Sequence, residues 1–90
     1  MFHYVYVLES EKNGALYVGC TEDLKRRLKE HNREMNFPTK PYTPWRVIHC
    51  EAYLNEKDAR RREKYLKINQ GARLLKRMLK EYFYAKKKNS

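Results

Sequence analysis

The fold is decided near the start of the chain, where residues 3–9 read HYVYVLE and residues 15–19 read ALYVG. The first stretch is rich in β-branched and aromatic residues and has apolar side chains at both parities, which is typical of a strand covered on both faces. Between the two stretches, residues 11–14 (EKNG) have the composition of a turn. The sequence therefore predicts a β-hairpin.

A helix is expected after the hairpin. The Thr21 hydroxyl can cap free amides at a helix start, and the acids at positions 22–23 suit the positive end of a helix dipole. Leu24, Leu28 and His31 then follow helical spacing. We expect this helix to end within residues 32–36.

A loop and a third strand are expected next. All three prolines fall in residues 37–44, which excludes a helix interior and predicts a semi-rigid loop. Residues 45–54 alternate in the manner of a strand. The side chains on one of its faces would be Ile48, Cys50, Ala52 and Leu54.

Two helices complete the predicted fold. Asn55 is placed to cap a helix that runs to about residue 68, and residues 69–71 (NQG) interrupt the pattern. The final helix carries apolar residues at helical spacing, namely Leu74, Leu75, Met78, Leu79 and Tyr82. The order β-β-α-β-α-α predicts an α/β chain of the α+β kind, a small three-stranded antiparallel sheet flanked by helices. Residues 1–84 would form the domain, and residues 85–90 a basic, flexible tail.

The chain is short and basic. Its 90 residues fit one small domain, and Lys and Arg total 21 against 11 acids, for a net charge of +10. Residues 1–55 hold eight basic residues and seven acids, whereas residues 56–90 hold thirteen and four. Nearly all of the excess positive charge thus lies in the second part. This balance favours a polyanionic partner.

Several other classes of protein are not indicated. The longest apolar run, residues 4–8, is far shorter than the roughly 20 residues of a membrane span, and the opening Met-Phe-His lacks the order of a signal peptide. Cys20 and Cys50 form no Cys-x-x-Cys motif, so neither a zinc site nor a disulfide framework is indicated. We expect an intracellular, cytoplasmic protein with reduced thiols and no membrane partner.

One set of residues keeps a fixed order over almost the whole chain. Tyr4-Val5-Tyr6 precedes Tyr17-Val18-Gly19, and Arg27, His31 and finally Glu63, in the segment RREKYLK, follow. In order and spacing the chain resembles the GIY-YIG endonuclease superfamily, and its small stand-alone, single-domain branch in particular. Two positions depart from the pattern. Tyr4 stands in place of the first glycine, and Cys20 stands where several relatives carry a lysine.

The resemblance implies a divalent-metal-dependent endonuclease. It implies that two adjacent strands carry the aromatic tripeptides, that one helix supplies an arginine, and that a later helix supplies a glutamate for the metal. The catalytic residues would be Tyr6, Tyr17, Arg27 and His31. Glu63 would bind a single Mg²⁺ or Mn²⁺ ion.

Phosphodiester hydrolysis calls for such residue types, because it needs an in-line water, a cation on the non-bridging oxygens and a proton for the leaving oxygen. Tyr17 would activate the water with support from Tyr6, provided that cations stabilise a phenolate. Arg27 offers bidentate donation to phosphate, and His31, one helical turn further on, would relay a proton. One carboxylate with waters and phosphate oxygens is an adequate shell for one ion.

Each of these residues also has a purely structural interpretation. A strand tyrosine is more often part of a core, and a histidine near a helix end is more often a capping or surface residue. Glu63 has the spacing to pair with Arg60 or Lys67 on its own helix. Spacing alone favours the structural interpretation, and it is the resemblance to the GIY-YIG superfamily that favours a functional site.

The expected substrate is DNA, with RNA left open. The residues expected to grip flanking phosphates are Arg60, Arg61, Lys64, Lys67, Arg73, Lys76 and Arg77. Phosphate contacts carry no sequence information, so we expect selection of DNA structure or damage, as in DNA repair. A homodimer would help so small a domain to hold two strands. The competing hypothesis is a non-catalytic nucleic-acid-binding adaptor with the same fold.

Overall fold

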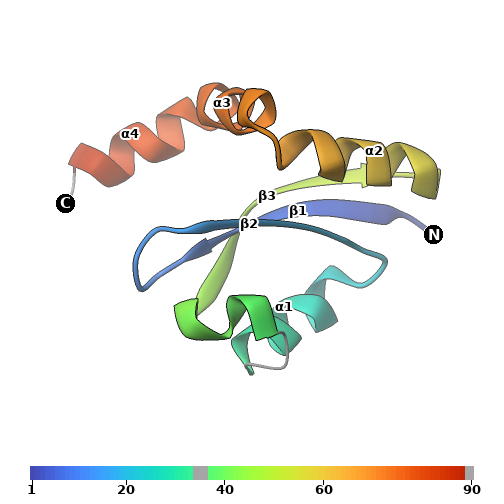
Figure 1. Ribbon diagram of the computed structural model, residues 1–90, viewed down its shortest axis with the longest axis horizontal. Coiled ribbons are helices and arrows are strands. Elements are labelled where there is room, and N and C mark those ends of the chain that lie inside the picture. The colour runs from blue at the N-terminus through green and yellow to red at the C-terminus, as the bar shows by residue number, and fades with distance from the viewer. Residues whose placement is uncertain (34–36, 89–90) are drawn as a thin grey trace.

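The computed structural model describes residues 1–33 and 37–88 as a three-stranded antiparallel sheet with helices on both faces. The strands are β1 (His3–Ser10), β2 (Leu16–Thr21) and β3 (Trp45–Tyr53), in the order β2-β1-β3. The helices are α1 (Leu24–Asn32), the 3₁₀ helix η1 (Phe37–Tyr42), α2 (Glu56–Leu66), α3 (Asn69–Met78) and α4 (Lys80–Lys88). Figure 1 shows α2, α3 and α4 on one side of the sheet and α1 and η1 on the other. The predicted α+β fold is confirmed.

The central strand β1 is buried on both faces. Val5 and Val7 pack against residues of α2 and α3, among them Leu66 and Leu75. Tyr6 and Leu8 belong to a second cluster with Trp45, on the side of α1. The two-sided strand predicted from the sequence is therefore confirmed, and the sheet divides the core into two halves.

The predicted hairpin is confirmed. β1 pairs with β2 so that Tyr6 lies opposite Gly19 and Leu8 opposite Tyr17. Gly14 closes the turn with a φ of +77°, in the left-handed region that favours glycine, and its N–H donates to the Ser10 carbonyl at 2.9 Å.

The helix starts agree only in part with the sequence. Asn55 caps α2 as predicted, because its Oδ1 accepts from the Lys57 N–H at 2.8 Å. At α1 the predicted cap is wrong: the carboxylate of Asp23 accepts from the Arg26 N–H at 3.0 Å. Thr21 instead ends β2, and its hydroxyl accepts from the Asp23 N–H at 3.1 Å. α1 ends at Asn32, and the remainder of its predicted end, residues 34–36, lies outside the described residues.

The predicted loop over residues 37–44 is wrong in part, since residues 37–42 form η1 with Pro41 inside it. The fixed φ of proline, near −65°, is also the φ of a 3₁₀ helix, so the ring fits a short segment of this kind. The indole N–H of Trp45 donates to the Thr39 carbonyl at 2.9 Å and ties η1 to β3.

The last helices differ from the prediction in two ways. Residues 69–71 begin α3 instead of interrupting a helix. Gly71 is buried where α2 and α3 meet, and a Cβ there would lie 2.0 Å from the Tyr65 carbonyl oxygen. The predicted final helix is divided at Leu79 into α3 and α4.

The chain expected as a tail from residue 85 continues α4 as far as Lys88, and residues 89–90 lie outside the described residues. The Lys86 ammonium donates to Glu9 of β1 at 2.6 Å. The division of the chain at residue 84 stays a prediction.

β3 contains an irregularity opposite Val7 and Leu8, where the register shifts. A bulge of this kind interrupts strict alternation. Ile48 consequently packs against the cluster of α2 and α3, whereas Cys50, Ala52 and Leu54 are exposed. The four residues predicted to share one face therefore do not share one environment.

Two carboxylates tie the helices to the sheet. Glu9, 1% exposed, accepts hydrogen bonds from Arg46 of β3 and from Tyr82 and Lys86 of α4. Glu51 of β3 accepts from the Arg62 guanidinium at 2.8 and 3.1 Å. His49 and Tyr53 also bind Glu51, at 2.9 and 2.7 Å.

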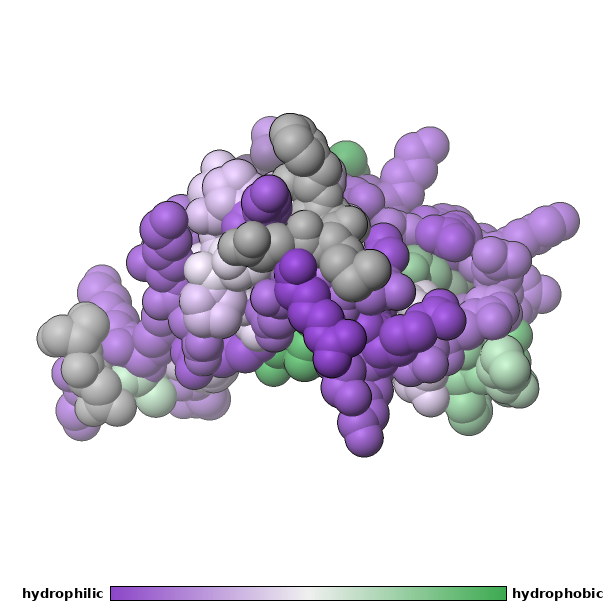
Figure 2. Space-filling view, turned by 90° about the horizontal axis from the view of Figure 1, so that it is seen from below, coloured by the Kyte–Doolittle hydropathy of each residue, from purple (hydrophilic) through white to green (hydrophobic). Residues whose placement is uncertain are grey.

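The surface on the α1 side is mostly hydrophilic, and hydrophobic residues gather toward the end away from α4 (Figure 2). Phe2 and Leu54 are both exposed. They adjoin the His3–Tyr53 pair, where β1 begins and β3 ends. Within the described residues, no helix has both the length and the apolar character needed to cross a membrane.

The Glu51 network predicts an acid-dependent loss of stability. Burial alone would raise the pKa of Glu51, but the hydrogen bonds from Arg62, His49 and Tyr53 outweigh it and lower the pKa from 4.5 to about 2. Because the folded-state pKa is depressed, this stabilisation is present above about pH 4.5 and is lost as the pH falls toward 2. We expect Glu51→Gln to lower the free energy of unfolding at pH 7 by up to about 3 kcal/mol.

Denaturant unfolding between pH 7 and about pH 2 measures the effect, and the acid-dependent decline should be smaller in Glu51→Gln than in the unaltered chain. Glu56→Gln is the matched control, since Glu56 is an exposed carboxylate of α2. Identical pH profiles for the two variants would contradict the prediction.

Candidate active site

Tyr6, Tyr17, Arg27 and His31 gather on the α1 side of the sheet. The rings of Tyr6 (β1) and Tyr17 (β2) have centroids 6.5 Å apart. The His31 ring of α1 lies edge-on to both, with centroids 6.0 Å from Tyr6 and 5.0 Å from Tyr17. Arg27 lies one turn earlier on α1, and its positive charge opposes the rise of the Tyr6 pKa.

The Tyr6 hydroxyl stands in a chain of hydrogen bonds. It lies 3.0 Å from Nε2 of His31, and Nδ1 of His31 lies 2.8 Å from Oγ1 of Thr39. A neutral imidazole donates through one ring nitrogen and accepts through the other, so Tyr6 and Thr39 take opposite hydrogen-bonding roles toward His31.

Burial keeps this pair neutral. It raises the pKa of Tyr6 in spite of the positive charge of Arg27, and the nearby groups Tyr17 and Glu63 raise it further. Burial also lowers the pKa of His31, and the positive charge of Arg27 acts in the same direction. Tyr6 is 1% and His31 0% exposed, so at neutral pH the two form a buried phenol–imidazole pair.

Gly19 makes room for the Tyr6 ring. A Cβ built on Gly19 would lie 2.3 Å from the Tyr6 hydroxyl oxygen and 2.4 Å from Cζ. Any side chain at this position would displace the phenol. From the sequence we expect Gly19 to belong to the second tripeptide and to end its strand, but β2 continues to Thr21. The contact with Tyr6 depends on the pairing of β2 with β1, so the sequence alone does not predict it.

Glu63 approaches from α2, on the other side of the sheet. Its side chain is 15% exposed, and its oxygens bind Arg60 at 3.4 Å and Lys67 at 3.0 Å. The helical pairing suggested by the spacing is therefore confirmed. The charge of Glu63 also contributes to raising the pKa of Tyr6 and of Cys20. Glu63 thus lies close to the residues of β1 and β2 that carry the two tripeptides.

A single divalent ion fits this carboxylate. In the part of the chain that the structure describes, no three His, Cys, Asp or Glu side chains form a group that could hold a metal ion. Mg²⁺ and Mn²⁺ prefer oxygen ligands and can take the remainder from water and phosphate. Metal binding at Glu63 would replace its ion pairs with Arg60 and Lys67.

The basic residues expected at the nucleic-acid interface are all exposed on α2 and α3 or just after α2: Arg60, Arg61, Lys64, Lys67, Arg73, Lys76 and Arg77. Arg60, Arg61 and Lys67 form ion pairs with acids of α2. Arg62, in the same basic run, differs from its neighbours because it binds Glu51 of β3.

Thr39 is a site residue that the sequence did not indicate. It is 1% exposed, and its hydroxyl meets His31 from η1. The proline-rich composition of its segment indicated rigidity, but no local pattern connects position 39 with position 31.

The model of the GIY-YIG catalytic domain matches residues 2–79. The chain belongs to the GIY-YIG family. The match includes both tripeptides, Arg27, His31 and Glu63, and it ends before α4.

Similar proteins identify the branch of this family. A UPF0213 protein of Clostridium perfringens is 34% identical over 92 residues, which cover 97% of this chain and 98% of that protein. The solution NMR structure of a UPF0213 protein from Bacillus halodurans is 31% identical, with a TM-score of 0.55, covering 87% of this chain and 85% of that one. The predicted membership of the small single-domain branch is confirmed.

A longer protein shares part of the domain. The structure-specific endonuclease subunit slx1 of Schizosaccharomyces japonicus is 42% identical over 52 residues, which cover 52% of this chain and 19% of that protein.

The contact between Gly19 and Tyr6 predicts a steric coupling. We expect Gly19→Ala to lower the free energy of unfolding by about 1–3 kcal/mol, because the new methyl group collides with the phenol. The same substitution should cost less in a Tyr6→Ala background, where the colliding ring is absent. Denaturant unfolding of the two single variants and the double variant measures the coupling. An equal cost in both backgrounds would refute it.

Proposed function

We propose that this GIY-YIG protein is a divalent-metal-dependent endonuclease that hydrolyses phosphodiester bonds in DNA and selects DNA structure or damage over sequence. GIY-YIG nucleases generally use divalent metal ions, and a nuclease domain implies a nucleic-acid substrate. The observation that supports the proposal most is the meeting of three rings, since those of Tyr6, Tyr17 and His31 have centroids 5.0–6.5 Å apart on the α1 side of the sheet. Arg27 lies one turn before His31 on α1, so a cation and two phenols belong to one region of the sheet.

The two tyrosines would have different tasks. Tyr17 is half-buried, whereas Tyr6 is 1% exposed. Tyr17 is therefore the phenol that water and substrate can reach. In its phenolate form it would accept the proton of the attacking water, and the leaving oxygen would take up a proton from solvent. Tyr6 would act as a positioning residue that holds Arg27 and the floor of the site. His31 and Thr39 fix the direction of the Tyr6 hydroxyl, and a proton relay through His31 stays a prediction.

Arg27 would stabilise the charge that develops on the phosphate. Its Nη1 binds Glu30 at 3.1 Å, and its side chain is 37% exposed. The five N–H donors of a guanidinium exceed what the contact with Glu30 uses, so donors remain for non-bridging oxygens. Lysine has no equivalent planar fork.

Glu63 would hold the ion, Mg²⁺ or Mn²⁺. A bound divalent ion supplies positive charge to the phosphate oxygens and lowers the pKa of a bound water. Metal binding at Glu63 would free Lys67 for the DNA backbone and leave Arg60 paired with Glu56 alone. Arg60 also acts electrostatically on Cys20, so a cation adjoins the position where several relatives carry a lysine.

The basic residues of α2 and α3 would bind phosphates and position the duplex. A homodimer and a cytoplasmic location stay predictions.

The metal role of Glu63 is tested by cleavage of supercoiled, nicked and branched DNA with Mg²⁺ or Mn²⁺ and with EDTA. We expect Glu63→Gln to reduce metal-dependent cleavage about 100-fold or more, because the ion loses its protein carboxylate. Glu56→Gln is the control, since Glu56 lies on the same helix and also pairs with Arg60. Cleavage that survives Glu63→Gln would overturn the site, and absence of metal-dependent cleavage on every substrate would favour the adaptor.

The role of Arg27 has a matched control one residue away. Arg26 also pairs with Glu30, but its side chain is 71% exposed. We expect Arg27→Lys to slow cleavage about 100-fold and Arg26→Lys to change it less than about twofold, because the charge of Arg27, and not that of Arg26, acts on Tyr6. Single-turnover cleavage rates measure both variants. Similar rates for the two would show that Arg27 has no special part in the reaction.

A further inference from the structure

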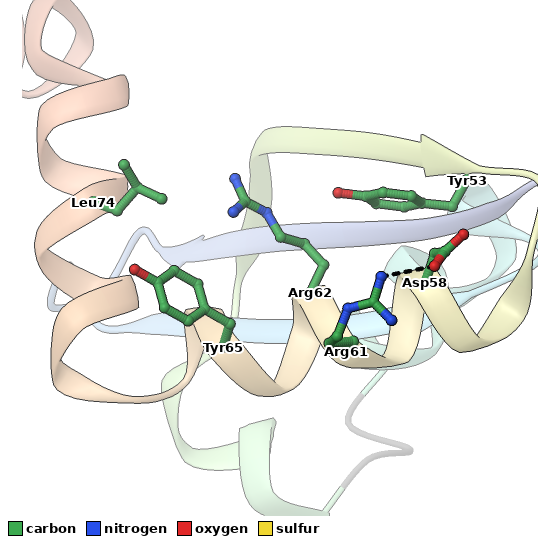
Figure 3. Close-up of a pocket in the computed structure, with 6 residues that line it drawn as sticks. All are labelled: Tyr53, Asp58, Arg61, Arg62, Tyr65 and Leu74. Atoms are coloured by element: carbon green, nitrogen blue, oxygen red, sulfur yellow. Dashed lines mark hydrogen bonds and ion pairs between the residues drawn. The ribbon is translucent and has the colours of Figure 1, made fainter.

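A hollow of about 450 Å³ lies between α2, β3 and α3. Its lining residues are Tyr53, Asp58, Arg61, Arg62, Tyr65 and Leu74 (Figure 3). Sites for small organic groups commonly have volumes of about 300–1,000 Å³. None of the residues proposed for the cleavage chemistry lines this hollow. Glu63 acts on residues of β1 and β2, whereas its neighbour Arg62 binds Glu51 of β3.

Two aromatic rings and a guanidinium form its walls. Figure 3 shows Tyr53 and Tyr65 on either side of Arg62, with Leu74 extending from α3. The Arg62 Cζ lies 6.0 Å from the centre of the Tyr65 ring, within the range of a cation–π contact. Both tyrosines and Leu74 are half-buried. The hollow therefore offers flat π surfaces and a planar cation that remain in part accessible.

The walls are held in place by the fold. Arg62 makes two hydrogen bonds to Glu51, and the Tyr53 hydroxyl donates to the same carboxylate. These bonds fix the Arg62 and Tyr53 side chains before any ligand arrives. A pocket with fixed side chains loses little conformational freedom on binding.

The rim adds hydrogen-bonding groups. Arg61 and Asp58 form an exposed ion pair with a distance of 2.7 Å. The pair offers donors and an acceptor together, and the edge of a nucleobase requires both kinds of group. Exposed Arg73 and Arg77 flank Leu74 along α3, so phosphates next to a bound base would meet positive charge.

We propose that this hollow, the Tyr53–Tyr65 pocket, binds an unpaired base of a single-stranded DNA segment. Aromatic side chains and arginine are the groups on which single-stranded bases stack, and stacking tolerates any base because every base has a π face. An apolar peptide would make no use of the cations around the pocket. The proposal rests on the proposed function, because it assigns a DNA substrate.

The pocket would give a single-domain nuclease a means of structural selection. Unpaired bases occur at flaps, branches and frayed ends, whereas a continuous duplex keeps its bases stacked. α2 carries Glu63 as well as Tyr65 and Arg62, so an unpaired base in the pocket would be bound by the helix that also supplies the proposed metal ligand.

The test measures binding in EDTA, so that cleavage does not enter. The probes are a short oligothymidylate and a blunt duplex of equal length. We expect Tyr65→Leu to weaken binding of the single strand about tenfold and of the duplex less than about twofold, because leucine keeps apolar volume but has no π face. Tyr65→Phe, which keeps the ring, should bind both probes like the unaltered chain. Equal weakening on both probes, or none on the single strand, would overturn the proposal.

A second measurement uses the unaltered chain, since Tyr65 also packs partly against the core. Stacking of a base should shift the ring NMR signals of Tyr53 and Tyr65 during titration with oligothymidylate. Shifts confined to the signals of other residues would overturn the proposal that the pocket binds a base. A chain that binds the single strand through Tyr65 but cleaves no DNA would overturn the proposed function and leave the pocket standing. If the chain cleaves DNA with a metal ion but Tyr65→Leu does not weaken single-strand binding, the pocket proposal is overturned and the proposed function stands.

Discussion

The position of one phenol, that of Tyr6, constrains most of the structure around the candidate site. Its ring lies over Gly19, so β2 pairs with β1 in the one register that places a residue without a side chain there. A slip by one residue would turn Tyr6 to the other face of the sheet. The hydroxyl also binds His31, which fixes the approach of α1. Strand pairing and helix docking thus depend on the same buried group.

The helix α2 connects β3 with the region of the candidate site. Consecutive residues of a helix point about 100° apart, so Arg62 and Glu63 serve different neighbours. Arg62 binds Glu51 and anchors α2 to β3. Glu63 acts electrostatically on Tyr6 from the opposite face of the sheet. Loss of the Arg62–Glu51 contact would therefore disturb the position of Glu63, although neither of the two residues touches the tyrosines of the site.

Local patterns in the sequence were enough to predict the strands, the hairpin and the Asn55 cap, because each depends on residues a few positions apart. The Asp23 cap was missed because Thr21 and Asp23 are both suitable capping residues. The 3₁₀ helix around Pro41 was missed because the fixed φ of proline suits a loop as well as a 3₁₀ helix. The β3 bulge and the contact of Thr39 with His31 depend on tertiary pairing, which no local spacing encodes. The tyrosines, Arg27 and His31 were identified through the resemblance to the GIY-YIG superfamily, and their catalytic roles stay predictions.

The distribution of charge separates chemistry from substrate attraction. Tyr6 and His31, at the buried centre of the site, are kept neutral by burial, so they contribute hydrogen bonds without attracting a polyanion. The exposed cations of residues 56–90 would instead attract the polyanion, because nearly all of the excess positive charge lies there. A DNA strand would therefore meet α2 and α3 first. In the two proposals taken together, the strand would reach Glu63 by one face of α2 and the Tyr53–Tyr65 pocket by another, so a single helix would couple recognition of an unpaired base to the proposed cleavage nearby.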